Sequence, residues 1–129
     1  VELNTVGDYQ MFANERDNKN YDIFVGGWFS DYNDPLDFLN VMKTGVYDSY
    51  GLYSNSEYDS LIDSLTGEND NAKRLEIYQK LEDLLVAQDC GVAPLYYSDK
   101  HYYYQNWVKD FYTSSFGASQ ELYRASVQK

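Results

Sequence analysis

The chain has 129 residues, the length of one ordinary domain, and its 21 acidic residues against 10 Lys and Arg give a net charge of −11. Lys and Arg form no cluster anywhere along the sequence. Because phosphate binding depends on such clusters, the composition argues against nucleic acid and anionic membrane surfaces as partners.

The N-terminal quarter predicts alternating strand and helix. Val1–Val6 alternates apolar and polar side chains, as a half-buried strand does. A short helix is predicted over Asp8–Asp17, and its apolar face carries Tyr9, Phe12 and Ala13. Asp22–Trp28 has the β-branched and aromatic character of a second strand. Strand, helix and strand at this spacing predict a parallel, right-handed βαβ unit.

The segment after the second predicted strand is the most informative part of the chain. Two glycines, Gly26 and Gly27, allow another backbone to come close, and a carboxylate-rich turn follows. Pro35 fits the first turn of a helix. This order places Trp28 and Asp31 at the carboxyl end of a strand, where open α/β sheets usually bind ligands.

Helices are predicted for the middle of the chain. The first, with Leu36, Leu39 and Val41 on one face, ends near Lys43, and a loop is expected over Thr44–Asn55. Ser56–Asp59 has the pattern of a capping box and is expected to start a second helix. Gly67 is expected to end this helix. The apolar face of this second helix carries Tyr58, Leu61, Ile62 and Leu65.

The longest predicted helix begins at Asn69 or Asp70 and ends at Gly91. Its apolar stripe consists of Leu75, Tyr78, Leu81, Leu84 and Leu85. Its water-facing side consists of Lys73, Glu76, Lys80 and Asp83. The single cysteine, Cys90, has no partner for an intramolecular disulfide and is expected to be a small buried hydrophobe.

The remainder predicts further strands. Val92–Ser98 and His101–Gln105 have strand character, with Pro94 indicating an edge, and weaker candidates are Lys109–Tyr112 and Leu122–Arg124. The only histidine, His101, has no second His or Cys with which to share a metal. We therefore expect no metal site and no cofactor.

Four sequence blocks carry a family resemblance. Gly27–Leu39 resembles the GW-x-x-DY-x-DP-x-x-FL signature of the extracellular solute-binding proteins of oligopeptide and dipeptide ABC transporters. Three further blocks follow in the family's order: Tyr53–Ile62, Arg74–Glu82 and Val92–Tyr97. Members of the family are several times longer, so the chain resembles their C-terminal portion.

The resemblance implies a mixed α/β fold that is part of a two-lobed periplasmic-binding-protein-like architecture. Residues 1–98 would belong to one lobe, and residues 99–129 would form the hinge crossing and a return segment toward the other. It also implies capture of oligopeptides, without catalysis, by a monomer that delivers them to an ABC permease complex in the membrane. The expected location is the periplasm, or the outer face of a bacterial membrane to which a lipoprotein is tethered.

Asp31 and Trp28 are the leading site candidates. In the family the Asp of the DY pair takes a peptide's α-amino group, and it matches Asp31 without a gap. The alternative is that Asp31 only caps the turn before Pro35, in competition with Asp34, which is better placed as N-cap. Trp28 either walls a cleft and stacks on ligand backbone or belongs to the core.

Other residues are weaker candidates for ligand contact. Gly27, Trp28 and Phe29 could pair their backbone with an extended peptide, which would give broad specificity. Tyr32 and Tyr97 either contact the ligand through their hydroxyl groups or pack. The sequence places no Lys or Arg near the signature, so a peptide's carboxylate is either bound by another part of the protein or left free.

Two other functions compete. A carbohydrate-binding module would use the many Tyr and Trp side chains, and relatives that carry nickel, haem or oligosaccharides share the overall pattern. A glycosidase would need a carboxylate pair from Asp31, Asp34 and Asp37. Acidic residues are favoured at a helix start by the helix dipole, which accounts for Asp34 and Asp37 without catalysis.

Overall fold

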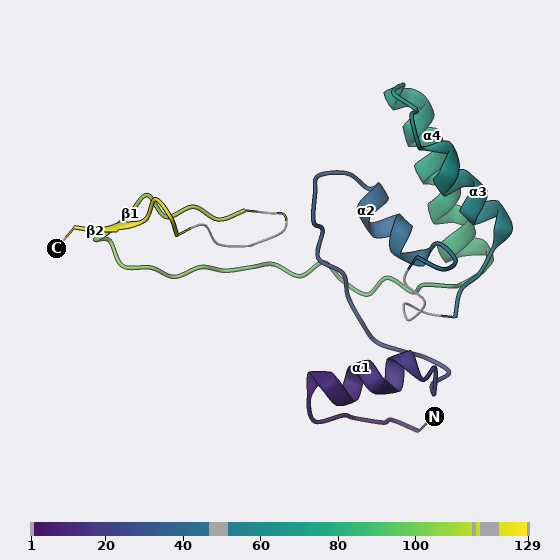
Figure 1. The fold of residues 1–129 in the computed structure, drawn as a ribbon, viewed down its shortest axis with the longest axis horizontal. Helices are drawn as coiled ribbons and strands as arrows, with labels where there is room; N and C mark the ends of the chain where they lie inside the picture. The colour runs from purple at the N-terminus through teal and green to yellow at the C-terminus, as the bar shows by residue number, and fades with distance from the viewer. Residues whose placement is uncertain (1, 47–51, 115, 117–121, 129) are drawn as a thin grey trace.

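The structure, a computed structural model, describes residues 2–46, 52–114, 116 and 122–128. Helices dominate, and the one sheet among these residues has two strands. In chain order the elements are α1 (Tyr9–Asp17), α2 (Leu36–Leu39), η1 (Asn40–Met42), α3 (Ser56–Ser64), α4 (Asn71–Glu82), η2 (Asp83–Gln88), β1 (Val108–Lys109) and β2 (Ser126–Val127). Figure 1 shows α2, α3 and α4 packed together, with α1 below them and the strand pair at the far end of an extended chain.

The first helix forms where the sequence predicts it. Asp8 is the N-cap of α1, and its carboxylate accepts a hydrogen bond from the backbone N–H of Met11 at 2.9 Å. Phe12 on this helix contacts the ring of Phe24, with 5.3 Å between ring centres, and Tyr21 also contacts Phe24. Ala13 is buried, whereas Tyr9 is largely exposed. A small aromatic cluster therefore holds α1 against the segment that follows it.

We call α2, η1, α3, α4 and η2 the helical unit, because their apolar faces form one core. Tyr58 of α3 and Leu81 of α4 are completely buried at its centre. The Tyr58 hydroxyl donates to the backbone carbonyl of Leu39 at 2.8 Å, which ties α3 to α2. The other buried members are Leu39, Val41, Met42, Ile62, Leu65, Tyr78, Leu84 and Leu85. The predicted apolar faces of all three helices are largely confirmed.

The helix ends of the unit follow local chemistry. Asp70 caps α4 and accepts from the backbone N–H of Ala72 at 2.9 Å. Gly67 takes the left-handed conformation at φ +82° beyond the end of α3, as predicted. The predicted capping box is displaced by one residue. Asn55, and not Ser56, is the N-cap of α3, with its side chain accepting from Glu57 N and Tyr58 N.

Two predictions of burial in the long helix are wrong. Leu75 is 57% exposed, because it lies to one side of the helix face that Arg74, Tyr78 and Leu81 turn toward the rest of the unit. Cys90 is exposed as well, since η2 ends at Gln88 and Cys90 lies beyond its last turn. Cys90 itself adopts the left-handed conformation, at φ +52°. The left-handed residue after the helix is therefore Cys90, one position before Gly91, where the sequence predicts the helix end.

The predicted βαβ unit is wrong for the described residues. Residues 2–6 and Asp22–Trp28 are in no strand, and neither are Val92–Ser98 and His101–Gln105. These segments have extended patterns, but a strand is stabilised by a hydrogen-bonded neighbour, and the described part of the chain places none beside them. The only strands among the described residues, β1 and β2, are antiparallel with Val108 opposite Val127. They lie close to the two weaker C-terminal candidates.

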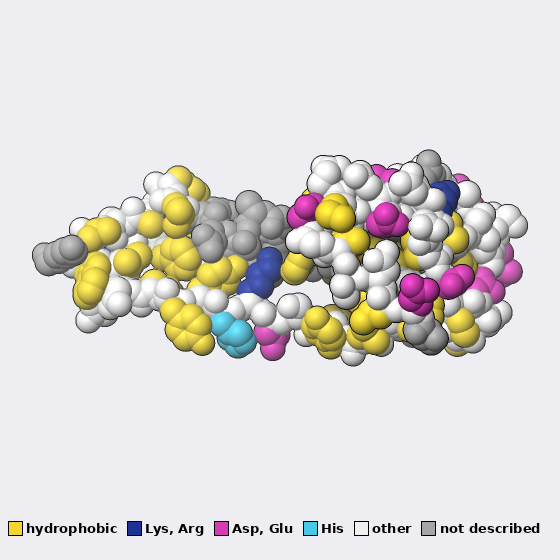
Figure 2. All heavy atoms as spheres, turned by 90° about the horizontal axis from the view of Figure 1, so that it is seen from below, with side chains coloured by type: hydrophobic (Ala, Val, Ile, Leu, Met, Phe, Trp, Pro, Cys, Tyr) yellow, Lys and Arg dark blue, Asp and Glu magenta, His cyan; other side chains and the backbone are white. Residues whose placement is uncertain are grey.

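We call residues 21–28 and 92–105 the extended segments. They carry many exposed apolar side chains: Ile23, Val25, Leu95, Tyr96, Tyr97, Tyr103 and Tyr104. Figure 2 shows hydrophobic side chains along the narrow part of the molecule that joins the helical unit to the strand pair. Among the described residues, no helix has the length and apolar character needed to cross a membrane.

Candidate functional site

The signature segment, residues 27–39, leads from an extended segment into α2, and two aspartates fix its path. Asp37 lies inside α2 and is 7% exposed. One of its carboxylate oxygens, Oδ2, accepts from the indole Nε1–H of Trp28 at 3.0 Å and from the backbone N–H of Asp31 at 2.8 Å. Since Leu39 of the same helix is buried in the core, Asp37 is held on a fixed support.

Asp34 forms the second anchor and ties the signature segment to α4. Its Oδ2 accepts from Arg74 Nη2 at 2.7 Å, and its Oδ1 accepts from the Tyr78 hydroxyl at 2.5 Å. Arg74 also hydrogen-bonds to Tyr78 and donates through Nη1 to the backbone carbonyls of Leu65 and Glu68. The guanidinium therefore joins three parts of the molecule, which are the signature segment, the end of α3 and the start of α4.

The environment of the Asp34 anchor shifts the pKa values of Asp34 and Tyr78 in opposite directions. Burial by itself would raise the pKa of Asp34, but hydrogen bonds from Tyr78 and the backbone of Leu36, with the charge of Arg74, lower that pKa below its ordinary value. Burial, together with the hydrogen bond to Asp34 and its charge, raises the pKa of Tyr78 to about 12. Asp34 is thus an ionised acceptor and Tyr78 a neutral donor at neutral pH.

The two leading candidates lie on the surface side of these anchors. The side chain of Asp31 is exposed, although its backbone N–H is bound by Asp37. Trp28 is half-buried and packs against the core of the helical unit. The role of cap belongs to Asp34, whose Oδ1 accepts from the backbone N–H of Leu36 at 2.9 Å. Asp31 therefore remains exposed, while its backbone N–H shares Asp37 Oδ2 with the indole of Trp28.

The weaker candidates divide into two groups. Gly27 has open space where a side chain would stand, and Phe29 is exposed, so both lie at the surface next to Trp28. Tyr32 is half-exposed, and its backbone carbonyl accepts from the Ser30 hydroxyl and from Asp34 N. Tyr97 is 99% exposed on an extended segment. The structure brings the candidates of residues 27–32 together and leaves Tyr97 unpacked.

Cations do reach the signature segment, contrary to the expectation from sequence distance. Arg74 is forty positions away but pairs with Asp34. Lys100 of an extended segment places its Nζ 4.7 Å from the centre of the Phe29 ring, a cation–π contact. Arg74 is committed to its hydrogen bonds, whereas the Lys100 ammonium lies at the surface.

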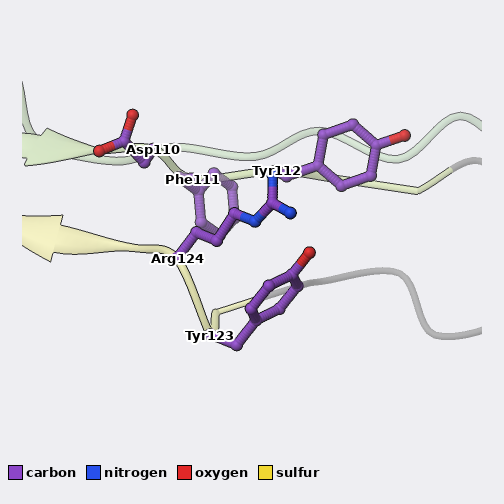
Figure 3. Close-up of a pocket in the computed structure, with 5 residues that line it drawn as sticks. All are labelled: Asp110, Phe111, Tyr112, Tyr123 and Arg124. Carbon is purple, nitrogen blue, oxygen red and sulfur yellow. The ribbon is translucent and has the colours of Figure 1, made fainter.

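A groove of about 400 Å³ lies elsewhere, beside the strand pair. It is lined by Asp110, Phe111, Tyr112, Tyr123 and Arg124. Figure 3 shows the Arg124 side chain reaching between Tyr112 and Tyr123 while the Asp110 carboxylate points away, and Arg124 stacks on the Tyr123 ring at 5.1 Å. With its one cation stacked on the adjacent Tyr123 ring, the groove is a weaker candidate than the signature segment. Among the described residues, no group of three or more His, Cys, Asp or Glu side chains is placed to hold a metal.

Sequence reasoning missed the roles of Asp37 and Arg74. Asp37 was assigned to the favourable helix dipole, yet it accepts from groups outside its helix. Its position between Leu36 and Leu39, on a helix whose apolar face is buried, is a signal that could have indicated a buried acceptor. For Arg74 the sequence offers no comparable signal, because its partner is distant along the chain.

Comparison with known proteins finds similar sequences among oligopeptide-binding proteins. The chain is 30% identical over 112 residues, 85% of its length, to the oligopeptide-binding protein OppA of Bacillus subtilis. It is also 30% identical over 101 residues, 78% of its length, to the periplasmic oligopeptide-binding protein OppA of Salmonella typhimurium. This chain is similar to these two oligopeptide-binding proteins over most of its own length. It spans only 19% and 18% of the length of these two relatives.

One further relative has a different named ligand, and two other comparisons find no match. A probable deoxycholate-binding periplasmic protein of Escherichia coli, YgiS, is 34% identical over 70 residues, which is 54% of this chain and 13% of that protein. No family model matches the sequence. No solved structure matches it either.

Proposed function

We propose that this chain is the C-terminal part of an extracellular solute-binding protein that captures oligopeptides for an ABC importer. The supporting observation is the similarity to oligopeptide-binding proteins over about four fifths of the chain. Capture is non-covalent and the protein performs no catalysis. Oligopeptide-binding relatives that are named periplasmic favour the periplasm as the location. The alternative in this proposal is a lipoprotein tethered to the membrane at the cell surface.

The parent protein has two lobes in this proposal, and it acts as a monomer that docks on an ABC permease complex. Residues 1–98 belong to one lobe, and residues 99–129 cross the hinge and return toward the other. The exposed apolar side chains of the extended segments support this assignment, because so many of them need a covering surface. A chain that spans less than a fifth of its relatives leaves ample protein to supply that surface.

In the proposed binding mode, Asp31 pairs with the ammonium group of a peptide and Trp28 walls the cleft. A hydrogen bond to a charged group is worth about 1.5–3 kcal/mol, against about −8 kcal/mol for micromolar affinity. Gly27 and Phe29 add backbone pairing to an extended ligand, and Tyr32 and Tyr97 add hydroxyl contacts. Because only part of the cleft belongs to this chain, the isolated 129 residues bind peptide weakly or not at all.

The test is calorimetry of the full-length protein with trialanine, once with a free amino group and once N-acetylated. We expect acetylation, or Asp31→Asn, to weaken binding about 10-fold or more, as loss of a charge-assisted bond implies. A matched control is Asp63→Asn, which removes a carboxylate charge from the exposed side of α3. Equal affinity for both peptides would remove Asp31 from its proposed role.

A second candidate function is capture of another small solute by the same fold. This second function is supported by the similarity to a probable deoxycholate-binding protein and by the abundance of aromatic side chains. Titration of the full-length protein with deoxycholate and with maltodextrins tests it. Quenching of Trp fluorescence by either compound, together with silence toward trialanine, would replace the peptide proposal.

A further inference from the structure

Asp37 differs from an ordinary acidic residue at a helix start. Such residues accept from the free N–H groups of their own first turn. Asp37 instead accepts from two donors that precede the helix by several residues, the indole of Trp28 and the backbone N–H of Asp31. Both donors belong to residues of the candidate site, and a single buried oxygen serves them.

We propose that Asp37 is a positioning residue that presets the ligand-binding geometry of Trp28 and Asp31. This inference rests on the proposed function, since it assigns to Asp37 the preparation of that same site. Asp37 does not touch the ligand, because it is 7% exposed and faces the inner side of the signature segment.

The physical basis is the number of constraints that one carboxylate imposes. The bond to Nε1 fixes the rotation of the indole plane, and the bond to Asp31 N fixes the backbone from which the exposed carboxylate projects. Bonds to an ionised acceptor are about twice as strong as neutral ones. The donors remain positioned before a ligand arrives, so binding requires less ordering of the site.

The opposite side of the segment is held independently. Asp34, three residues before Asp37, accepts hydrogen bonds from Arg74 and Tyr78 of α4. The path of the loop therefore survives when Asp37 alone is changed, and the loss is expected to be local to Trp28 and Asp31. This separation makes the positioning role measurable apart from folding.

The experiment uses the full-length protein with two readouts, trialanine affinity by calorimetry and the Trp28 indole N–H resonance by NMR. The resonance is assigned by its disappearance in Trp28→Phe. For Asp37→Ala we expect at least about 10-fold weaker trialanine binding, an upfield shift of the Trp28 N–H and faster exchange with solvent. The matched control is Glu76→Ala, which removes one negative charge from the exposed surface of α4 and should change neither readout.

Asp37→Asn is the conservative variant, because an amide oxygen accepts the same two bonds without the charge. We expect it to retain affinity within about threefold and to shift the indole resonance less than Asp37→Ala does. If Asp37→Ala does not fold, Asp37→Leu, which has a similar volume and no acceptor, takes its place. An unchanged indole resonance in whichever of these two variants folds would overturn the proposal.

The outcomes also separate this inference from the proposed function. Wild-type protein that ignores trialanine, with a Trp28 resonance that still moves in Asp37→Ala, would contradict the peptide ligand and support the hold of Asp37 on the indole. Wild-type protein that binds trialanine through Asp31, with affinity and resonance unchanged in Asp37→Ala, would overturn the inference and leave the function standing.

Discussion

The helical unit and the extended segments differ in the solvent exposure of their apolar side chains. In the helical unit Tyr58 and Leu81 are completely buried, and each helix contributes to one core. In the extended segments Ile23, Leu95 and Tyr97 are mostly exposed. Figure 1 shows the same contrast in the backbone, with packed helices on one side and a long unpaired chain leading to the strand pair.

The contrast follows from where each kind of structure finds its hydrogen bonds. A helix closes its backbone bonds within a few residues and needs only an apolar stripe to pack. An extended segment forms its backbone hydrogen bonds only with a neighbouring strand. The helical unit is therefore complete within the chain, whereas the extended segments offer backbone and aromatic groups to whatever lies beside them.

The largest test of this contrast compares two leucines. Leu81→Ala, at a fully buried position, should lower the free energy of unfolding by about 3 kcal/mol, from lost burial and the cavity left behind. Leu95→Ala removes the same atoms from an exposed position, 73% open to solvent, and should cost less than about 0.5 kcal/mol. Urea unfolding followed by far-ultraviolet circular dichroism measures both. Similar costs for the two variants would mean that Leu95 packs in solution.

The next effect concerns the Asp34 anchor. Asp34→Asn weakens the bonds from Arg74 and Tyr78 and should cost about 1–2 kcal/mol at neutral pH, in the lower part of the range for charged hydrogen bonds because the site is partly exposed. Asp63→Asn is the control. Its ion pair with Lys43 involves a largely exposed carboxylate, so it should change stability by less than about 0.5 kcal/mol.

The cost of Asp34→Asn should also depend on pH. The folded-state pKa of Asp34 lies below the ordinary value of 3.8, so the unfolded chain takes up the proton first as the pH falls. The stabilisation is complete above pH 3.8 and is lost as the pH falls through the lower pKa of the folded state. Unfolding curves of wild type and variant should converge in that acidic window. A difference that stays constant down to the acid limit would contradict an ionised anchor.

A smaller effect separates two candidate caps of α3. Asn55→Ala should cost about 1 kcal/mol, because the Asn55 side chain accepts from Glu57 N and Tyr58 N. Ser56→Ala, at the position favoured by the sequence pattern, should cost less than about 0.5 kcal/mol. The measurement is the shift of the urea midpoint for each variant. The reverse order would restore the capping box to its predicted register.

The sequence predicts what is decided locally. The spacing of Tyr58, Ile62 and Leu65 identifies the buried face of α3, and Asp8 and Asp70 cap the helices that follow them. Partners that are distant along the chain are not predictable in this way. Extended patterns such as Asp22–Trp28 indicate a strand, but whether a neighbour pairs with it depends on parts of the protein far away in sequence or outside this chain.

The candidate site divides in the same way. The signature indicates Trp28 and Asp31, and in the structure the half-buried indole of Trp28 and the backbone N–H of Asp31 share one acceptor, Asp37. The link from Asp34 to Arg74 joins residues forty positions apart, and no spacing rule connects them. The ligand contacts of Trp28 and Asp31 therefore stay a prediction from the sequence, whereas the hydrogen bonds of Asp37 and Arg74 that support this segment are visible only in the fold.

The smallest expected effect lies within α4 itself. Leu75 has the spacing of the buried stripe, but it is 57% exposed, whereas Leu81 on the same helix is fully buried. The first turn of α4 is covered on the side of Arg74, which contacts Asp34 and the end of α3, so Leu75 is exposed because it faces another direction. Leu75→Ala should therefore change the free energy of unfolding by less than about 0.5 kcal/mol, helped by the high helix propensity of alanine. A cost near that of Leu81→Ala, in the same urea assay, would mean that the side of α4 that carries Leu75 is covered in solution.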